Sequence, residues 1–390
     1  MEKVKILKAV DIINDSVSEY EGERPFLSTG DLNLSTITNL ELHTFSEKPS
    51  RANQNVSSGD LILARMQGTV KVKLINNEDE NIIVSTGFLV LRPKINADSK
   101  YLFHLLKSSN FQNDKDKLCT GATQKAINNS NFEKLEIPLP NLATQQRIAA
   151  ILDQADAIIQ NNRAIVQKYD ALTQSLFLDM FGDPVKNEKG WEVVQVENVA
   201  SNEKHSIKAG PFGSSLKKEF YVEKGYKIYG QEQVIKDDMS YGDYYIDEKK
   251  YKELESCRVK EGDILISLVG TYGKVSIIPD NFEEGIINPR LMKISPNKNI
   301  IRPDFLKFLL QSSYVEKQLK NHSRGGTMDI INVGIIRKLF IPLPSLEMQN
   351  QFAERVAVIE AQKQKAQLEL AKSEELFQSL LQRAFKGELN

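Results

Sequence analysis

The tetrapeptide Ile137-Pro138-Leu139-Pro140 recurs as Ile341-Pro342-Leu343-Pro344, 204 residues further along the chain. Each proline fixes its own φ and biases the preceding residue to extended geometry, so neither segment can be helical. About 41 residues without proline or glycine follow each segment, from Asn141 to Phe181 and from Ser345 to Phe385. Stretches of this length predict two matched helices, each roughly 60 Å long. The chain therefore carries two copies of one pattern, an extended segment followed by a long helix.

The rest of the chain repeats at nearly the same offset. The further matches are Leu105-Leu106 with Leu309-Leu310, Gly121 with Gly325, Lys134-Leu135 with Lys338-Leu339 and, one residue out of step, Gly59-Asp60 with Gly262-Asp263 and Lys71-Val72 with Lys274-Val275. An offset held across about 120 residues indicates an internal duplication. Because two copies are too few for a solenoid, we predict a duplicated two-part unit, which favours a duplicated or two-fold target.

Each copy begins with a part that mixes strands and helices. Apolar runs after Gly-Asp predict strands at Leu61–Ala64 and Ile264–Ser267, and β-branched runs predict further strands at Ile82–Val84 and Val275–Ile278. Apolar residues at helical spacing predict short helices at Tyr101–Leu106 and Phe305–Leu310. These patterns predict a globular α+β domain in each copy.

The two long segments show apolar residues in alternating steps of three and four, a heptad pattern with polar interruptions. The expected seam positions are Leu152, Ala155, Ile159, Asn162, Val166, Tyr169, Thr173, Leu176 and Met180, and then Val356, Ile359, Lys363, Ala366, Leu370, Ser373, Phe377, Leu380 and Ala384. One interpretation is a long amphipathic helix packed on each globular domain. Because the helices are matched in length, we favour their packing on each other as an antiparallel coiled coil, with the globular domains at its opposite ends. Asn162 within the seam would favour one register.

The predicted domain boundaries follow from these patterns. They are 1–140 for the first globular domain, 141–182 for the central helix, 183–344 for the second globular domain and 345–390 for the C-terminal helix. Gly182-Asp183-Pro184 provides the stop signal for the central helix.

Composition excludes several classes of protein. The chain has 390 residues, more than one hydrophobic core usually supports, and 41% hydrophobic with 26% charged residues is typical of a folded domain rather than a disordered one. No apolar run is long enough for a membrane helix, and the N-terminus does not resemble a signal peptide. The two cysteines, Cys119 and Cys257, form no CxxC pair, so we expect free thiols in a reducing cytoplasm. The net charge of −1 argues mildly against nucleic-acid binding, although a basic face can coexist with acidic surfaces elsewhere.

We find no pattern that predicts catalysis. Asn288-Pro289 lacks the remainder of an adenine-methylation loop, so we interpret it as a turn. Gly270–Lys274 has two residues between its glycines where a phosphate-binding P-loop has four. The histidines His43, His104, His205 and His322 are isolated and lack metal-ligand spacing. We therefore expect no catalytic residue, cofactor site or metal site in this chain.

Several motifs, taken in order, resemble one known family. They are the paired Ile-Pro-Leu-Pro segments with Gln145 and Gln349 after them, Ser175-Leu176-Phe177 through Met180–Pro184, Gly190-Trp191, the two Gly-Asp strands and the ending Arg383–Leu389. Each motif is weak alone, but their order and duplication resemble the specificity subunit of a type I restriction-modification system over nearly the whole chain.

The resemblance implies a non-catalytic subunit that reads DNA. In that family two target recognition domains each read one half of a bipartite, interrupted DNA site. The two helices set the spacing and dock two modification subunits, which methylate adenine with S-adenosylmethionine, and restriction subunits join that core. These properties are expectations from the resemblance alone.

DNA reading requires basic and amide side chains on loops, since Arg or Lys can read guanine and Gln can read adenine. The candidates in the first domain are Arg51, Gln54, Arg65, Gln67, Thr69, Lys71, Lys73, Gln124 and Lys125. The candidates in the second domain are Lys208, Ser214, Ser215, Lys217, Lys218, Gln231, Gln233, Tyr272, Lys274, Arg290 and Arg324. For any one of them, an ordinary solvated surface residue is the simpler explanation, so the clusters carry more weight than their members.

Three clusters are the most informative. Gly210–Lys218 combines a rigid turn, small hydroxyl groups and two cations, while Gly121–Lys125 and Ser323–Thr327 are glycine-containing loops at equivalent positions of the repeat. Backbone amides in such loops can approach phosphate, although each could equally be a simple connection before a strand. Two alternatives remain open: an orphan or phase-variable recognition cassette, and a coiled-coil scaffold that binds only protein.

Overall fold

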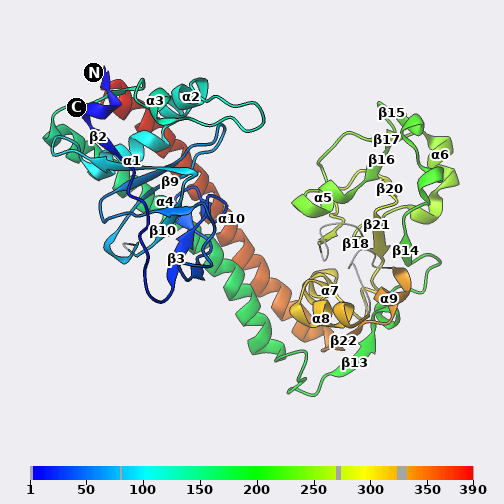
Figure 1. The fold of residues 1–390 in the computed structure, drawn as a ribbon. Helices are drawn as coiled ribbons and strands as arrows, with labels where there is room; N and C mark the ends of the chain where they lie inside the picture. The colour runs from blue at the N-terminus through cyan, green and yellow to red at the C-terminus, as the bar shows by residue number, and fades with distance from the viewer. Residues whose placement is uncertain (1–2, 80, 269–273, 323–331, 390) are drawn as a thin grey trace. The chain divides into compact units, whose positions relative to one another are not determined.

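The computed structural model describes residues 3–79, 81–268, 274–322 and 332–389. The chain divides into two compact units, of which the first contains Met1–Val166 with Lys365–Asn390 and the second contains Gln167–Gln364 (Figure 1). Each unit therefore combines one globular domain with a stretch of both long helices. Among the described residues, no helix has both the length and the apolar character needed to cross a bilayer.

The first globular domain is built from small sheets and short helices. Its strands are β1 Lys3–Lys5, β2 Val10–Ile13, β3 Arg24–Leu27, β4 Leu32–Asn33, β5 Thr36–Ile37, β6 Glu41–His43, β7 Ala52–Gln54, β8 Leu61–Ala64, β9 Val72–Leu74, β10 Ile83–Ser85, β11 Phe88–Pro93 and β12 Glu136–Pro138. They pair in the orders β2-β11-β8-β9, β6-β3-β10-β7, β1-β12 and β4-β5. The helices are α1 Ser99–Lys107, α2 Ser109–Lys117 and α3 Asn129–Phe132, with 3-10 turns η1 Ile6–Lys8 and η2 Asn77–Asp79.

The second globular domain repeats this plan. Its strands are β13 Glu192–Gln195, β14 Ile207–Ala209, β15 Tyr221–Val222, β16 Tyr226–Tyr229, β17 Tyr245–Ile246, β18 Ile264–Ser267, β19 Val275–Ile277, β20 Gly285–Ile287, β21 Leu291–Ile294 and β22 Phe340–Leu343. The helices are α5 Gln231–Lys236, α6 Glu248–Glu253, α7 Pro303–Leu310, α8 Ser313–His322 and α9 Val333–Arg337, and the 3-10 turns are η3 Val196–Val199, η4 Gly213–Ser215, η5 Lys218–Phe220 and η6 Glu255–Cys257. The sheet β14-β21-β18-β19 corresponds to β2-β11-β8-β9, and the pair β13-β22 corresponds to β1-β12.

The central strand of each domain lies between two hydrophobic cores. Leu61 and Leu63 of β8 face one core and Ile62 faces the other, because successive side chains of a strand point to opposite sides. In β18, Ile264 and Leu265 divide in the same way. A strand buried on both faces needs an unbroken apolar run, which explains why these segments lack polar alternation.

The duplication extends to the backbone hydrogen bonds. Arg65 N donates to Gly87 O at 3.0 Å, and Leu268 N donates to Arg290 O at 2.9 Å, with both partners shifted by 203 residues. Further pairs of equivalent bonds are Ala64 N to Lys71 O with Ser267 N to Lys274 O, and Ile75 N to Asp60 O with Ile278 N to Asp263 O. The two domains therefore share a frame that is defined by backbone contacts.

A buried glutamine joins each domain to its long helix. Gln145 donates to the carbonyl oxygens of Asn96 and Pro140, and its own side-chain oxygen accepts the amide of Asp98. Gln349 makes the equivalent bonds with Ile300 O, Pro344 O and Arg302 N. Both glutamine side chains are fully buried.

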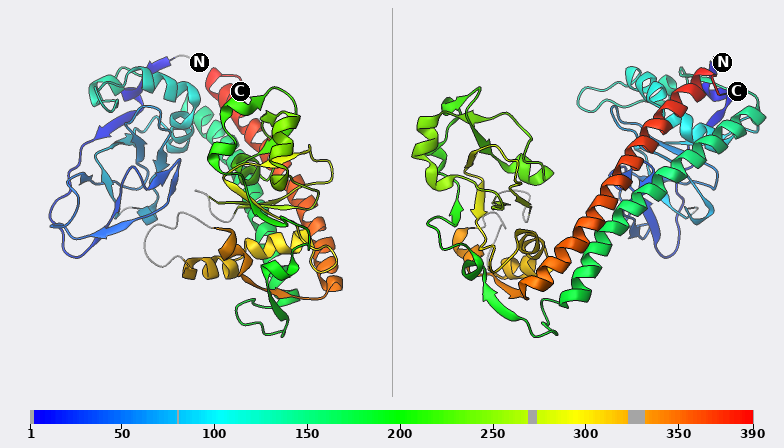
Figure 2. Two further views of the ribbon diagram at one scale, coloured as in Figure 1. Left: turned by 90° about the vertical axis from the view of Figure 1, so that its right-hand side faces the viewer. Right: turned by 180° about the vertical axis from the view of Figure 1, so that it is seen from behind.

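The long helices are α4 Leu142–Phe181 and α10 Leu346–Lys386, which lie side by side in both views of Figure 2. Asn162 Nδ2 donates to Ser373 Oγ at 2.8 Å, and Lys363 pairs with Asp170 at 2.6 Å. A higher residue number on one helix meets a lower number on the other, so the pair is antiparallel. Every expected seam residue is buried or half-buried, which confirms the predicted seam. The predicted α+β fold with an antiparallel coiled coil is likewise confirmed.

Candidate nucleic-acid interface

In the first domain several loops meet where β8 ends and β11 begins. Arg65 N donates to Gly87 O, Gln67 N donates to Lys125 O at 2.9 Å, and Thr86 N donates to Arg51 O at 2.9 Å. An isolated bridge also pairs Met66 with Ala126. We call this surface the first loop face, defined by Arg51, Arg65–Thr69, Thr86–Gly87 and Gly121–Ala126. It brings together two groups of predicted residues that lie more than fifty positions apart in the sequence.

Four predicted residues of the first domain are exposed on this face. They are Arg51, Gln67, Gln124 and Lys125. The Gly121 backbone, at φ 141°, lies in the region that favours glycine, and a Cβ there would lie 2.3 Å from Gln124 O. The cluster Gly121–Lys125 is therefore a tight loop that requires its glycine.

The other predicted residues of the first domain are held by internal contacts. Gln54 is buried and donates to Ser85 O and Phe88 O. Arg65 is half-buried and binds Phe88 O, Ile127 O and Asn129 Oδ1, and burial lowers the pKa of its guanidinium. Half-buried Lys73 pairs with Asp79 at 2.9 Å, and half-buried Lys71 donates to Thr29 O at 2.6 Å. Half-buried Thr69 lies on the face and contacts Gln67 O at 3.5 Å. These geometries argue against base contacts by Gln54, Arg65 and Lys73.

The second domain has an equivalent surface at the same end of its central sheet. Leu268 N donates to Arg290 O, and Asn288 N donates to Tyr229 O at 2.9 Å. A Cβ at Gly210 would lie 1.8 Å from Asn288 O, so glycine allows these two loops to touch. We call this surface the second loop face, defined by Gly210–Lys218, Gly230–Gln231, Leu268, Lys274 and Asn288–Arg290.

Most predicted residues of the second domain lie on this face. Ser214, Lys217, Lys218, Lys274 and Arg290 are exposed, and Ser215 and Gln231 are half-buried. Gln231 donates to Ser267 Oγ at 2.6 Å. Lys208, half-buried in β14, lies beside the face rather than on it. The predicted turn at Asn288-Pro289 is present, because Asn288 Oδ1 accepts the Arg290 amide at 2.9 Å.

Three predicted residues of the second domain are not seen on this face: one is buried, and two lie outside the described residues. Gln233 is buried, accepts the Gly230 amide and donates to Tyr241 O, so it stabilises the start of α5. Tyr272 and Arg324 lie outside the described residues, as does the cluster Ser323–Thr327.

Two features of the faces were not predicted from the sequence. Phe212 is 88% exposed on the second loop face, although aromatic residues are usually buried. Lys115 is fully buried beneath the first loop face. A sequence signal existed for each: a phenylalanine between proline and glycine, and a lysine one helical turn after Phe111 on the apolar side of α2.

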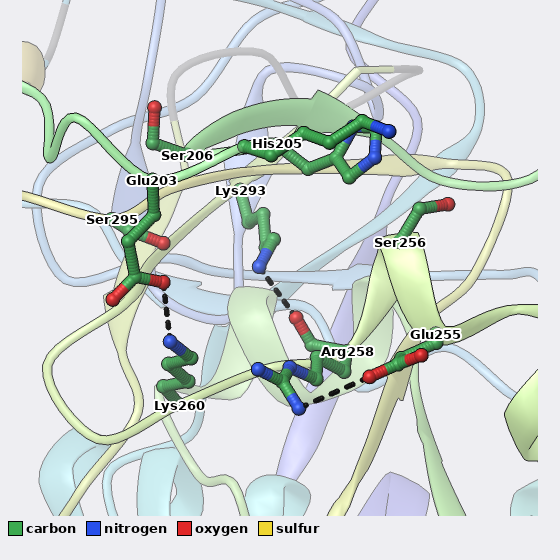
Figure 3. Close-up of a pocket in the computed structure, with 10 residues that line it drawn as sticks. Glu203, His205, Ser206, Glu255, Ser256, Arg258, Lys260, Lys293 and Ser295 are labelled. Atoms are coloured by element: carbon green, nitrogen blue, oxygen red, sulfur yellow. Dashed lines mark hydrogen bonds and ion pairs between the residues drawn. The ribbon is translucent and has the colours of Figure 1, made fainter.

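A charged pocket of about 310 Å³ lies at the other end of the sheet of the second domain, beyond Ile207 and Ile294 (Figure 3). Lys293 donates to Arg258 O at 2.5 Å, Arg258 pairs with Glu255, and Lys260 pairs with Glu203. Burial raises the pKa of nearby Asp263, and Lys293 opposes that shift. Four charged side chains of this pocket therefore form two ion pairs, and His205 and Lys204 also line it. Among the described residues no group of His, Cys, Asp and Glu side chains could hold a metal ion.

Comparison with known proteins gives one consistent result. The family described as "Type I restriction modification DNA specificity domain" matches residues 4–168 and 188–370. The type I restriction enzyme MjaVIII specificity subunit of Methanocaldococcus jannaschii is 27% identical over 389 residues, covering 91% of this chain and 84% of that relative. The EcoBI specificity subunit of Escherichia coli is 26% identical over 295 residues, covering 69% of this chain and 62% of that relative.

Two solved structures share the fold. One, which concerns complex assembly and conformational transition of the type I R-M system, superposes with a TM-score of 0.60 at 20% identity and covers 100% of this chain and 98% of that chain. The other is the S subunit of the type I restriction-modification system from M. genitalium, with a TM-score of 0.54 at 18% identity, covering 98% of this chain and 96% of that chain.

Proposed function

Because this chain belongs to the family of type I restriction modification DNA specificity domains, we propose that it is the sequence-specific DNA-binding subunit of a type I restriction-modification complex. Each globular domain reads one half of a bipartite, interrupted DNA site. The paired helices set the spacing between the halves and dock two modification subunits. The corresponding parts are residues 1–140 and 183–344 for reading, and 141–182 and 345–390 for spacing and docking.

One observation supports this proposal above the others. The two loop faces lie at equivalent ends of equivalent sheets and share backbone bonds such as those of Arg65 and Leu268, yet matched positions carry different side chains, Arg65 against Leu268 and Gly87 against Arg290. Two domains that bind two different short DNA sequences need the same backbone arrangement with different side chains on it. A scaffold that binds only protein would not need cations and amides gathered at both equivalent loop ends.

The proposed contacts are the accessible residues of the two faces. They are Arg51, Gln67, Thr69, Gln124 and Lys125 in the first domain, and Ser214, Ser215, Lys217, Lys218, Gln231, Lys274 and Arg290 in the second. Arginine and glutamine can read base edges, whereas lysines and hydroxyl groups also bind phosphate. Phe212 presents an apolar side chain of the kind that other proteins insert between base steps.

We assign no catalytic step to this chain. Adenine methylation would use S-adenosylmethionine bound by the modification subunits, and restriction subunits would join the same complex, in the cytoplasm. As an orphan or phase-variable recognition cassette, the chain would read DNA in the same way. The chain alone should therefore not methylate DNA, and methylation by the purified chain with S-adenosylmethionine would contradict this assignment.

Domain exchange tests the proposal directly. Replacing residues 1–140 with the first domain of another family member should change one half of the motif methylated in a host that supplies the modification subunits. Replacing residues 183–344 is the matched control and should change only the other half. Sequencing of methylated adenines reads both halves in one experiment. If either exchange changed both halves together, the domains would not read independently.

A further inference from the structure

Lys115 is a charged residue enclosed beneath a reading loop. It lies on α2 with its side chain fully buried, and its Nζ donates to Met66 O and Thr69 O, both at 3.1 Å. The same Nζ lies 3.3 Å from Asp116 Oδ1. A buried ammonium is unfavourable unless it is paired and hydrogen-bonded; here two of its donors bind carbonyl oxygens, and Asp116 supplies the opposite charge. Burial also lowers the pKa of the Lys115 ammonium, an effect that Asp116 opposes.

Asp116 holds the two residues between those carbonyl groups. Its Oδ2 accepts the Gly68 amide at 2.9 Å, and its backbone oxygen accepts Gln67 Nε2 at 3.4 Å. Gly68 has φ 70°, a conformation that favours glycine. Two adjacent residues of α2 therefore bind each of the four residues Met66–Thr69.

In the part of the chain that the structure describes, this lysine arrangement occurs in the first domain. The residue equivalent to Lys115 in α8 is Leu319, which packs in the hydrophobic core of the second domain. Leucine fits a buried helix position of this kind and has no side-chain donor for a loop. A core position that accepts leucine in one copy has no packing need for lysine in the other, so the lysine serves the loop rather than the core.

We propose that Lys115 and Asp116 are positioning residues that fix the Met66–Thr69 loop and thereby set the base preference of the first domain. This inference rests on the proposed function. Gln67 and Thr69 present their side chains from a backbone whose carbonyl and amide groups are tied to α2. Discrimination between bases requires donors and acceptors in fixed places, so a loosened loop reads its bases less selectively.

The first test measures the loop itself in the purified full-length chain. Lys115→Met keeps the length and apolar stem of the side chain, but it removes one partner of a buried ion pair and should therefore lower stability. Asp116→Ala removes the acceptor of the Gly68 amide and serves if the first variant does not fold. Hydrogen exchange of the segment 65–70 should accelerate by roughly tenfold in either variant, since hydrogen bonds to charged groups are lost. Unchanged exchange in both variants would overturn the proposal.

The second test measures specificity in the assembled complex by sequencing methylated adenines. Lys115→Met should lower discrimination at one or two positions of the first half-site by about 5- to 100-fold, the range for loss of a good base contact. The second half-site should keep its sequence. The matched control is Lys227→Met, because Lys227 is equally buried but binds Ser240 O and Glu283, away from both loop faces.

The outcomes separate the two proposals. If the complex with the wild-type chain methylated no bipartite DNA motif, the proposed function would be wrong. Hydrogen exchange would still test the positioning of the loop. A normal wild-type motif that persists unchanged in Lys115→Met and Asp116→Ala would contradict the positioning role alone. Equal relaxation of both half-sites would indicate a general structural effect and would also overturn the inference.

Discussion

At the scale of single residues, burial decides which polar side chains remain available for a ligand. Gln54 and Gln231 were equal candidates from the sequence, yet Gln54 is buried with both amide donors bound to backbone oxygens, whereas Gln231 remains partly accessible. Residue type shows what a side chain can bind, but the neighbouring strands determine whether it can reach a ligand. The positions with the clearest access are the lysines of the second loop face.

Lys217→Ala combined with Lys218→Ala should weaken DNA binding and reduce its salt dependence. Both side chains are exposed, and Lys217 forms a loose pair with Glu219 at 3.6 Å. If both contact phosphate, the slope of log affinity against log salt should fall by up to about 2. Titration of the assembled complex with a DNA duplex at several salt concentrations measures this slope.

A matched double variant controls for the loss of two positive charges. Lys249→Ala with Lys252→Ala removes two exposed lysines from α6, which follows β17 at the end of β16 away from Gly230. This control should leave the slope unchanged. If the two double variants lowered the slope equally, net charge rather than the loop face would explain the effect.

The sequence predicted the exposed lysines and missed Phe212 and Lys115 for different physical reasons. Charged residues are rarely buried, so Lys217 and Lys218 were sound candidates on residue type alone. Aromatic side chains are usually buried, so residue type did not indicate that Phe212 would be exposed on its loop. The burial of Lys115 depends on hydrogen bonds to the carbonyl groups of Met66 and Thr69, which lie 49 and 46 residues away in the sequence.

At the scale of elements, the contact between the short helix and the long helix differs between the two copies. In the first unit, buried His104 on α1 lies 2.8 Å from Asp153 on α4 through its Nε2. The equivalent residues in the second unit are Phe308 and Ala357, and Phe308 packs edge-on against Phe352 of α10 at a centroid distance of 5.4 Å. One copy therefore uses a polar contact where the other uses an aromatic one.

This difference predicts an acid-sensitive contribution to stability. Burial lowers the pKa of His104 below its ordinary value of 6.5; Lys107 lowers it further, while Asp153 and Asp156 oppose the shift. Protonation of His104 is then easier in the unfolded chain than in the folded chain. The free energy of unfolding therefore has its full His104 contribution above pH 6.5 and loses it as pH falls from 6.5 through the lower pKa of the folded state. His104→Phe with Asp153→Ala should remove this loss, which for one proton cannot exceed about 1.4 kcal/mol per pH unit.

Unfolding in denaturant between pH 5 and pH 7.5 measures the effect. The control is Lys100→Ala, which removes the other partner of Asp153 but keeps His104 and should retain the acid dependence. A double variant that loses stability with pH as steeply as the wild type would exclude His104 as the titrating group.

Helices were easier to predict than sheets. The coiled-coil seam follows from local spacing, so residues such as Ile159 and Leu370 could be placed without tertiary information. Strand pairing joins distant segments, and no local pattern indicated that β10 runs parallel to β3 or that β20 runs parallel to β16. The loop faces depend on those pairings, which is why only their separate clusters were predicted.

At the scale of the whole molecule, residues that are equivalent in the repeat do not face each other. Asn162 corresponds to Ala366 by the 204-residue offset, but it bonds to Ser373. Antiparallel pairing reverses the order of one helix, so matched changes in the coiled coil must be placed at facing positions. An insertion after Asn162 and after Ala366 would instead lengthen the two helices at different layers.

A heptad inserted after Asn162 and another after Lys372 should lengthen both helices at one layer. Seven residues preserve the seam and add about 10 Å. Because DNA rises about 3.4 Å per base pair, the gap between the half-sites should grow by about three pairs. Three pairs also rotate one half-site by roughly 100°, so weaker binding is expected with both half-site sequences retained.

Sequencing of methylated adenines reports the gap in this variant. The control carries the heptad in α4 alone, which breaks the facing register and should abolish the bipartite motif. An active double insertion with an unchanged gap would mean that something other than these helices determines the spacing.

The two buried glutamines that join each domain to its long helix have a consequence for the inheritance of such genes. Gln145 and Gln349 hold their domains only through backbone oxygens and an amide, groups that nearly every amino acid supplies. These bonds do not depend on the side chains of the residues that supply them, in contrast to the apolar packing of Ile148 and Leu152 and the His104–Asp153 contact nearby. Genes for such chains could therefore exchange whole domains by recombination, and the hybrid protein would still close its joints. New DNA specificities would then arise by shuffling, as long as the hybrid also keeps the apolar packing of each domain on its helix.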